Sequence, residues 1–212
     1  MKTNIDIQPL VEVVKKLRSP NGCPWDKVQT HESLRRYFIE ETYEVVDAID
    51  NKDMDNLREE LGDVLLQVVF HSSIAEESGA FTLQDVINDV TEKMIHRHPN
   101  VFPEENPDNK GKIYTWDELK AQEKGNIRKS VLDGVSKGLP ALVAAQKLQD
   151  KAGKVGFDWD ELNPIWAKVN EEIGEFKEAV ALKDRENMEK EAGDVLFSLI
   201  NLFRWYKISG EN

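Results

Sequence analysis

The chain has 212 residues, of which 40% are hydrophobic and 32% charged, a composition that can bury a core and excludes intrinsic disorder. Lys and Arg number 28 against 40 Asp and Glu, a formal net charge of -12, so the chain is a poor binder of nucleic acid or of an anionic membrane surface. The single cysteine, Cys23, excludes an internal disulfide, and no stretch approaches the roughly 20 apolar residues of a membrane span, so we expect a cytoplasmic protein.

Helical periodicity runs through the first half of the chain. Pro9 suits the first turn of a helix, and Leu10 and Val13 follow at helical spacing. After a loop rich in turn formers comes a long periodic segment, and Asp53 is placed to cap the next one. We therefore predict helices from Pro9 to Arg18, from about Thr30 to Ile49, from about Met54 to Ser78, and from the N-cap Thr82 to just before Pro99.

Residues 99–139 have the composition of a linker. Pro99, Pro103 and Pro107 stand among Asn, Asp, Glu and Gly, while Thr115 begins a capping-box pattern that predicts a short helix. Helices are then predicted from Pro140 to about Ala152, from Pro164 onward, and from about Arg185 to Tyr206. No segment alternates with period two, so the predicted fold is all-α, with helical modules at 1–98 and 140–212 joined by the linker at 99–139.

The sequence repeats itself at an offset of 131 residues. Glu40-Glu41-x-x-Glu44 returns as Glu171-Glu172-x-x-Glu175, and Glu60-x-Gly62-Asp63 returns as Glu191-x-Gly193-Asp194. Five carboxylates in each copy keep their type and spacing while many other positions differ. The chain is therefore predicted to be a tandem duplication of one helical module.

The acidic residues of each copy can converge on one point. Residues three apart on a helix lie on the same face, so Glu41 and Glu44 share one face and Glu60 and Asp63 another. The short turn between the helices makes them antiparallel neighbours, which can bring the four carboxylates together. The same argument applies to the second set, Glu172, Glu175, Glu191 and Asp194.

An apolar run follows each second acidic pair, from Val64 to Phe70 and from Val195 to Ile200, and predicts a helix that is enclosed on most sides. Clustered carboxylates beside such a helix repel one another and lose hydration unless they are neutralised. A hard divalent cation removes both costs, so we predict a site for Mg²⁺, with Mn²⁺ as a substitute. A single ExxE motif is usually a solvated helix face, but two paired motifs in two copies favour metal binding.

Other metal chemistries fit the sequence less well. A di-iron carboxylate bundle uses Glu-x-x-His on two helices, and no His stands three residues after Glu44 or Glu60. His31-Glu32-x-x-Arg35 lacks the second His of a zinc protease motif.

The acidic motifs resemble the ExxE…ExxD signature of the all-α nucleoside triphosphate pyrophosphohydrolases. Three further segments resemble the two-module MazG family, so that the similarity covers nearly the whole chain: Gly22-Cys23-Pro24-Trp25-Asp26-Lys27-x-Gln29-Thr30-His31, Arg97-His98-Pro99-x-Val101-Phe102 and Val155-Gly156-Phe157-Asp158-Trp159. The resemblance implies a homodimer that hydrolyses nucleoside triphosphates to the monophosphate and pyrophosphate with Mg²⁺. It also implies broad base tolerance and a role in cleaning the nucleotide pool.

Candidate substrate contacts surround these motifs. Glu40 and Glu171 are candidates for a supporting position behind the metal ligands, and a solvated position is the alternative. Lys93 and Arg97, four apart on one helix, and Lys168, four before Glu172, are candidates to bind phosphate, whereas Trp25 is a candidate to stack on a base or to be buried in its loop.

The second copy departs from the family pattern, because the sequence stops at Asn212, where the counterpart of the basic helix at 82–97 would begin. Either the native chain is longer, or the first module is the competent site, or another subunit supplies the missing groups. A different class of function is also open, namely a non-catalytic, dimeric regulatory protein that binds metal and nucleotide without turnover.

Overall fold

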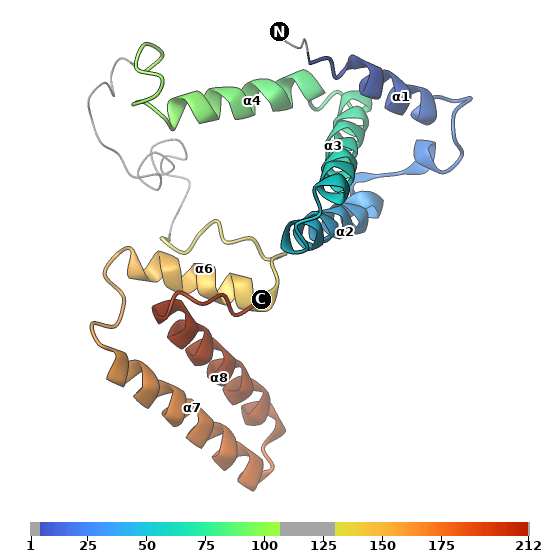
Figure 1. Cartoon of the computed structure of the whole chain (residues 1–212). Helices are drawn as coiled ribbons and strands as arrows, with labels where there is room; N and C mark the ends of the chain where they lie inside the picture. Colours follow the sequence, from blue (N-terminus) through green and yellow to red (C-terminus); the bar gives the residue numbers. More distant parts are fainter. Residues whose placement is uncertain (1–4, 107–129, 212) are drawn as a thin grey trace. The chain divides into compact units, whose positions relative to one another are not determined.

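The computed structural model describes residues 5–106 and 130–211, and the predicted short helix at Thr115 lies outside them. Every regular element in these residues is a helix, so the all-α prediction is confirmed (Figure 1). The chain divides into two compact units, Met1–Leu119 and Lys120–Asn212, and the division falls inside the predicted linker. No helix of the described residues is long and apolar enough to cross a membrane.

Residues 5–106 of the first unit contain four α-helices and a short 3-10 turn, close to the predicted bounds. They are α1 at Gln8–Arg18, the turn at Asp26–Val28, α2 at His31–Asp50, α3 at Met54–Glu77 and α4 at Leu83–His96 (Figure 1). Asp53 caps α3 by accepting from the backbone N–H groups of Asp55 and Asn56, and Thr82 caps α4 in a capping box with Asp85. Lys52 in the intervening turn has a φ of 56°, and the resulting reversal makes α2 and α3 an antiparallel hairpin.

The core of the first unit lies where α1 crosses the hairpin. Val14, Leu34, Val69 and Phe70 are all at most 5% exposed and form one cluster, with Leu83 of α4 packed against it. This core occupies the C-terminal half of α3, so the acidic first half of α3 lies beyond it.

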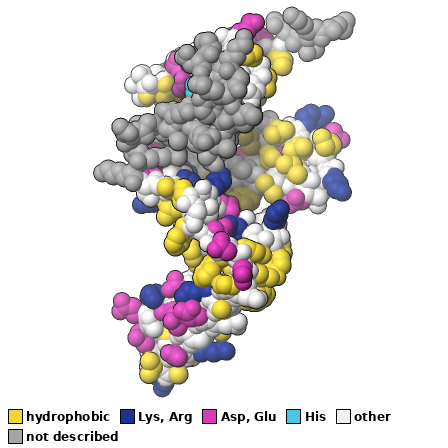
Figure 2. All heavy atoms as spheres, turned by 90° about the vertical axis from the view of Figure 1, so that its left-hand side faces the viewer, with side chains coloured by type: hydrophobic (Ala, Val, Ile, Leu, Met, Phe, Trp, Pro, Cys, Tyr) yellow, Lys and Arg dark blue, Asp and Glu magenta, His cyan; other side chains and the backbone are white. Residues whose placement is uncertain are grey.

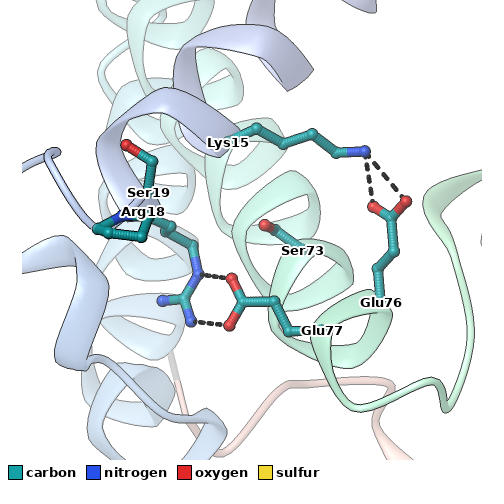
Figure 3. A pocket seen from close by; sticks show the side chains of 7 residues that line it. Lys15, Arg18, Ser19, Ser73, Glu76 and Glu77 are labelled. Carbon is teal, nitrogen blue, oxygen red and sulfur yellow. Dashed lines mark hydrogen bonds and ion pairs between the residues drawn. The ribbon is translucent and has the colours of Figure 1, made fainter.

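Arg18 fastens the end of α1 to α3, as Figure 3 shows. Its Nε and one terminal nitrogen donate to the Glu77 carboxylate at 2.8 and 2.7 Å, while the other terminal nitrogen donates to the carbonyls of Asp26 and Gln29. The side chain is 4% exposed, and its guanidinium lies 5.3 Å from the centre of the Phe70 ring. The cleft beside it, about 380 Å³, is lined by this pair and by a second ion pair between Lys15 and Glu76, so its charges already neutralise one another.

The second unit repeats the hairpin with one helix across it: α6 at Ala141–Gly153, α7 at Leu162–Leu182 and α8 at Arg185–Trp205 (Figure 1). Helix α7 begins at Leu162, two residues before the predicted start at Pro164, because the N–H of a residue in the first turn needs no helical partner and proline is tolerated there. The core of the second unit is formed by Ile165, Val169 and Leu202.

Each of the two apolar helices has one exposed apolar face, which agrees with the prediction that they are enclosed on most sides. Leu61 and Leu65 of α3 are 52% and 42% exposed, and Leu196 and Phe197 of α8 are 54% and 44% exposed. Among the described residues each core covers one side of its hairpin, so an apolar side of each hairpin remains on the surface.

Candidate metal centres

The first acidic cluster joins the middle of α2 to the second turn of α3. Carboxylate oxygens of Glu41, Glu60 and Asp63 lie within 4.8 Å of one another, and all three side chains are half-buried. Glu44 is exposed and outside this group of three, but its carboxyl group lies near enough to help raise the pKa of both Glu41 and Glu60. The hairpin thus brings together the residues that the sequence placed on facing sides of two helices.

The electrostatics of this cluster favour a cation. Burial, the hydrogen bond from Glu44 and the charges of Asp63, Glu44 and Glu60 raise the pKa of Glu41 to about 7. Burial and the neighbouring carboxylates raise the pKa of Glu60 as well. Within residues 5–106 no Lys or Arg forms an ion pair with any of the four carboxylates. The cluster therefore carries repulsion that only protonation or a bound cation can relieve.

The second cluster is deeper. Carboxylate oxygens of Glu172, Glu175 and Glu191 lie within 4.8 Å of one another, with Glu172 6% and Glu191 4% exposed. Glu175 is exposed, and its pKa is raised by partial burial and by the charges of Glu191 and Glu172. Asp194 lies outside this group of three and is half-buried.

Two lysines neutralise part of the second cluster. Lys168 Nζ lies 3.0 Å from Glu171 and 2.8 Å from Glu172, and Lys190 Nζ lies 2.9 Å from Glu191 and 3.7 Å from Asp194. The carboxylates raise the pKa of both ammonium groups. Figure 2 shows acidic and basic side chains interspersed at its lower end, where Figure 1 has the tip of the α7–α8 hairpin. At the matching positions the first copy has Tyr37 and Glu59, so only the second cluster has lysines of its own.

One buried oxygen in the second cluster lacks a partner among the described residues. Glu191 Oε2 is inaccessible and accepts no hydrogen bond, while Lys190 occupies the other oxygen. A buried carboxylate oxygen without a donor is costly, and three carboxylates that supply oxygen ligands suit a hard divalent cation. The donor set therefore fits Mg²⁺ or Mn²⁺ chemically.

The predicted phosphate-binding residues fall into two groups. Lys168 lies at the second cluster, and Glu171 is exposed beside it. Lys93 and Arg97 belong to the far end of α4, which runs away from the acidic half of α3 (Figure 1). Lys93 is exposed and Arg97, at the C-cap of α4, is 8% exposed. This chain therefore does not bring Lys93 and Arg97 to its own first cluster.

The two remaining candidates lie on the surface. Trp25 is 48% exposed, so the interpretation as a buried loop residue is wrong, and its ring meets Tyr37 edge-on at 5.8 Å. Glu40 is exposed on α2.

A cavity of about 610 Å³ adjoins the second cluster. Lys168, Glu172 and Asp194 line it together with Trp159, Gln149 of α6 and the α8 residues Phe197, Ser198, Asn201 and Arg204. Sequence reasoning missed Lys190 and the polar residues of this cavity. The sequence does contain a signal for this face of α8, because its cavity residues recur at helical spacing, at positions 194, 197, 198, 201 and 204.

Two helical hairpins, each carrying acidic residues that converge across it, define a tandem all-α protein with one carboxylate cluster in each repeat. A family model described as the MazG nucleotide pyrophosphohydrolase domain matches residues 29–102 and 162–211, which contain both hairpins. The chain belongs to the MazG nucleotide pyrophosphohydrolase family of enzymes.

Individual relatives agree with this assignment. The chain is 48% identical over 212 residues to the nucleoside triphosphate pyrophosphohydrolase/pyrophosphatase MazG of Thermotoga maritima, covering 100% of this chain and 80% of that protein. It is 43% identical over 203 residues to the nucleoside triphosphate pyrophosphohydrolase of Escherichia coli, covering 93% and 77%. It is also 51% identical over 201 residues to the uncharacterized protein YabN of Bacillus subtilis, covering 94% of this chain but 41% of that one.

Proposed function

We propose that this protein hydrolyses nucleoside triphosphates to the nucleoside monophosphate and pyrophosphate, with a divalent cation, Mg²⁺ or Mn²⁺, held by its acidic clusters. The names of the Thermotoga and Escherichia relatives support the reaction. The structural observation that carries the proposal is the second cluster, where three carboxylates, a lysine and a cavity of ligand size meet.

The second module is the proposed site of turnover. Glu172, Glu191 and Asp194 would hold the cation, with Glu175 beside them to serve the attacking water, and Lys168 offers its ammonium group to the triphosphate. A bound divalent cation supplies charge neutralisation and polarises the phosphoryl oxygens. In the first module Glu41, Glu44, Glu60 and Asp63 would hold a cation in the same way.

The chemistry requires a base for water. A water molecule attacks the α-phosphorus in line with the bridging oxygen, the bond from that oxygen to the α-phosphorus breaks, and pyrophosphate leaves. Glu175 is exposed to solvent and its pKa is raised toward neutrality, so it is the carboxylate best suited to accept the proton of this water. Lys168 stabilises the charge that develops on the phosphate oxygens.

Broad base tolerance, nucleotide-pool cleaning in the cytoplasm and a homodimeric state complete the proposal. The tested mixture contains the protein, Mg²⁺ and one of several nucleoside triphosphates, and the products are separated by ion exchange. Equimolar nucleoside monophosphate and pyrophosphate support the proposal, whereas orthophosphate and the nucleoside diphosphate contradict the cleavage position. Metal-dependent nucleotide binding without turnover would favour the regulatory alternative.

A further inference from the structure

The cavity beside the second cluster contains a buried acceptor without a partner. Gln149 is 7% exposed, and its Nε2 donates to the carbonyl of Phe197 at 2.7 Å. The opposite orientation of this amide would place two acceptors at that distance, so the assignment of its two ends is fixed. Gln149 Oε1 accepts no hydrogen bond from any described residue. A buried amide oxygen of this kind needs a donor, and Gln149 is one of the residues that line the cavity.

Asn201 lines the same cavity one helical turn beyond Phe197. Its Oδ1 accepts from Arg204 Nε at 3.0 Å, and a terminal nitrogen of Arg204 donates to Asp158. The arginine therefore fixes which end of the Asn201 amide is the acceptor, and its N–H groups are left to donate. The cavity presents an acceptor and a donor whose orientations are both set by other contacts.

These amides lie at a suitable distance from the acidic cluster. Asp194 and Asn201 are seven residues apart on one face of α8, which is about 10 Å along the helix axis. This span is comparable with the extent of a nucleotide from its α-phosphorus to its base. Trp159, 40% exposed, adds an aromatic face to the same wall.

In the first module, the α3 residues that correspond to the cavity residues Asn201 and Ser198 are buried. The position of Asn201 is taken by Phe70, which is 5% exposed and packs with Val14 and Leu34. The position of Ser198 is taken by Gln67, which is 8% exposed. The first module therefore has an apolar core residue where Asn201 borders the cavity of the second, although Gln67 Oε1 is also a buried acceptor without a partner among the described residues.

We propose that this cavity binds the nucleoside of the substrate, with Gln149 accepting a hydrogen bond from a base N–H, Asn201 donating one to the base, and Trp159 stacking on it. The inference rests on the proposed function and names the residues that recognise the substrate. Each common nucleobase carries an N–H donor beside an acceptor on its pairing edge, and an aromatic side chain can stack on any of the bases. One donor and one acceptor therefore admit every base, which gives broad tolerance a structural cause.

The test compares Gln149→Met, which removes the acceptor, with Asn201→Asp, which keeps the acceptor for Arg204 and removes the donor. Asn170→Ala, an exposed amide on α7 away from the cavity, is the matched control. Pyrophosphate release is measured with ATP, GTP, CTP and UTP, and with ribose 5-triphosphate, which has no base. Circular dichroism and thermal melting establish that each variant is folded.

We expect both cavity variants to raise KM about tenfold for all four nucleotides, the effect of losing one hydrogen bond to a ligand, with kcat nearly unchanged. Ribose 5-triphosphate and the Asn170→Ala control should show no change. An unaltered KM, or an equal loss with ribose 5-triphosphate, overturns the inference while leaving the proposed function intact. If the wild-type chain releases no pyrophosphate, the proposed function fails, and binding of ATP with an α,β-methylene bridge then decides the inference: weaker binding by both variants supports it, and equal binding overturns it.

Discussion

At the residue scale, the two acidic clusters differ in how their charge is balanced. Lys168 and Lys190 pair with the second cluster, whereas Tyr37 and Glu59 stand at the matching places in the first. The lysines lower the repulsion between carboxylates and provide a positive group for an anionic substrate. The first cluster can be neutralised only from outside or by protons. The duplicated motif thus has two different electrostatic environments.

This difference predicts unequal effects of matched substitutions. We expect Glu191→Gln to lower kcat/KM for pyrophosphate release at least about 100-fold, because it alters a buried oxygen donor beside the proposed reaction centre. Glu60→Gln, the same change at the matching position of α3, should lower it less than about threefold. Steady-state kinetics at saturating Mg²⁺ measure both. The reverse order of effects would move turnover to the first module.

The raised pKa of Glu41 predicts a pH-dependent stability. An acid whose pKa is near 7 in the folded protein and near 4.5 in the unfolded one binds more protons when folded, so the free energy of unfolding falls as pH rises from about 4.5 to 7. In EDTA we expect the Tm of the first unit to drop by roughly 5 °C over this range. Mg²⁺ should restore it at pH 7.5, and Glu41→Gln should reduce the dependence to the smaller part that Glu60 contributes. A Tm that rises with pH in wild type but not in the variant would contradict the prediction.

At the element scale, the sequence predicted most of the helices because their ends carry local signals. Asp53 and Thr82 cap the helices they were expected to cap, and the hairpin turn follows from three residues. The start of α7 was missed by two residues because Pro164 is also tolerated inside the first turn. The predicted enclosure of α3 and α8 on most sides leaves one apolar face of each helix exposed, because an apolar run indicates which residues avoid water but not whether the same chain covers all of them.

The acidic pairs were predictable for a related reason. Helical spacing and a three-residue turn fix the approach of Glu41 to Glu60, but side-chain choice decides which three oxygens meet. Glu44 and Asp194 therefore lie at the edges of their clusters although the pattern treats all four positions alike. Gln149 contacts Phe197, 48 residues away in sequence, and Arg204 contacts the loop residue Asp158, 46 residues away, and no local spacing reveals either contact.

Arg18 is the contact that ties α1, its following loop and α3 into one unit. Because its guanidinium is nearly buried and donates to four oxygens, we expect Arg18→Ala to lower the free energy of unfolding by about 2–3 kcal/mol. The exposed Arg58→Ala, which loses only its pair with Asp55, should change it by less than about 0.5 kcal/mol. Urea unfolding at pH 7 measures both.

The Arg18 effect should shrink in acid. The guanidinium holds the pKa of Glu77 below its usual value, so the stabilisation from this pair is present above about pH 4.5 and is lost as pH falls through the lower folded pKa. An equal cost at pH 7 and pH 3 would show that packing on Phe70, and not the ion pair, is the main contribution.

At the scale of the whole molecule, duplication has left two units with the same hairpin and different surroundings. In the first, the face of α3 beyond Asp63 is closed by Phe70 and α1, whereas in the second the same face of α8 borders a cavity. One unit is therefore suited to hold a cation and the other to hold a cation with a substrate. The exposed apolar side of each hairpin is the feature that both units share.

That shared apolar side predicts self-association. Leu61, Leu65 and Leu196 are between 42% and 54% exposed on helices whose other faces are packed, and burial of such side chains in a second copy stabilises a dimer by about 25 cal/mol per Å². We expect light scattering after size exclusion to give a dimer. The double substitution Leu65→Lys and Leu196→Lys should give a monomer, whereas Leu182→Lys at the end of α7, 78% exposed, should remain dimeric. A wild-type monomer at tens of micromolar, or a double variant that still dimerises, would show that these faces are not the contact.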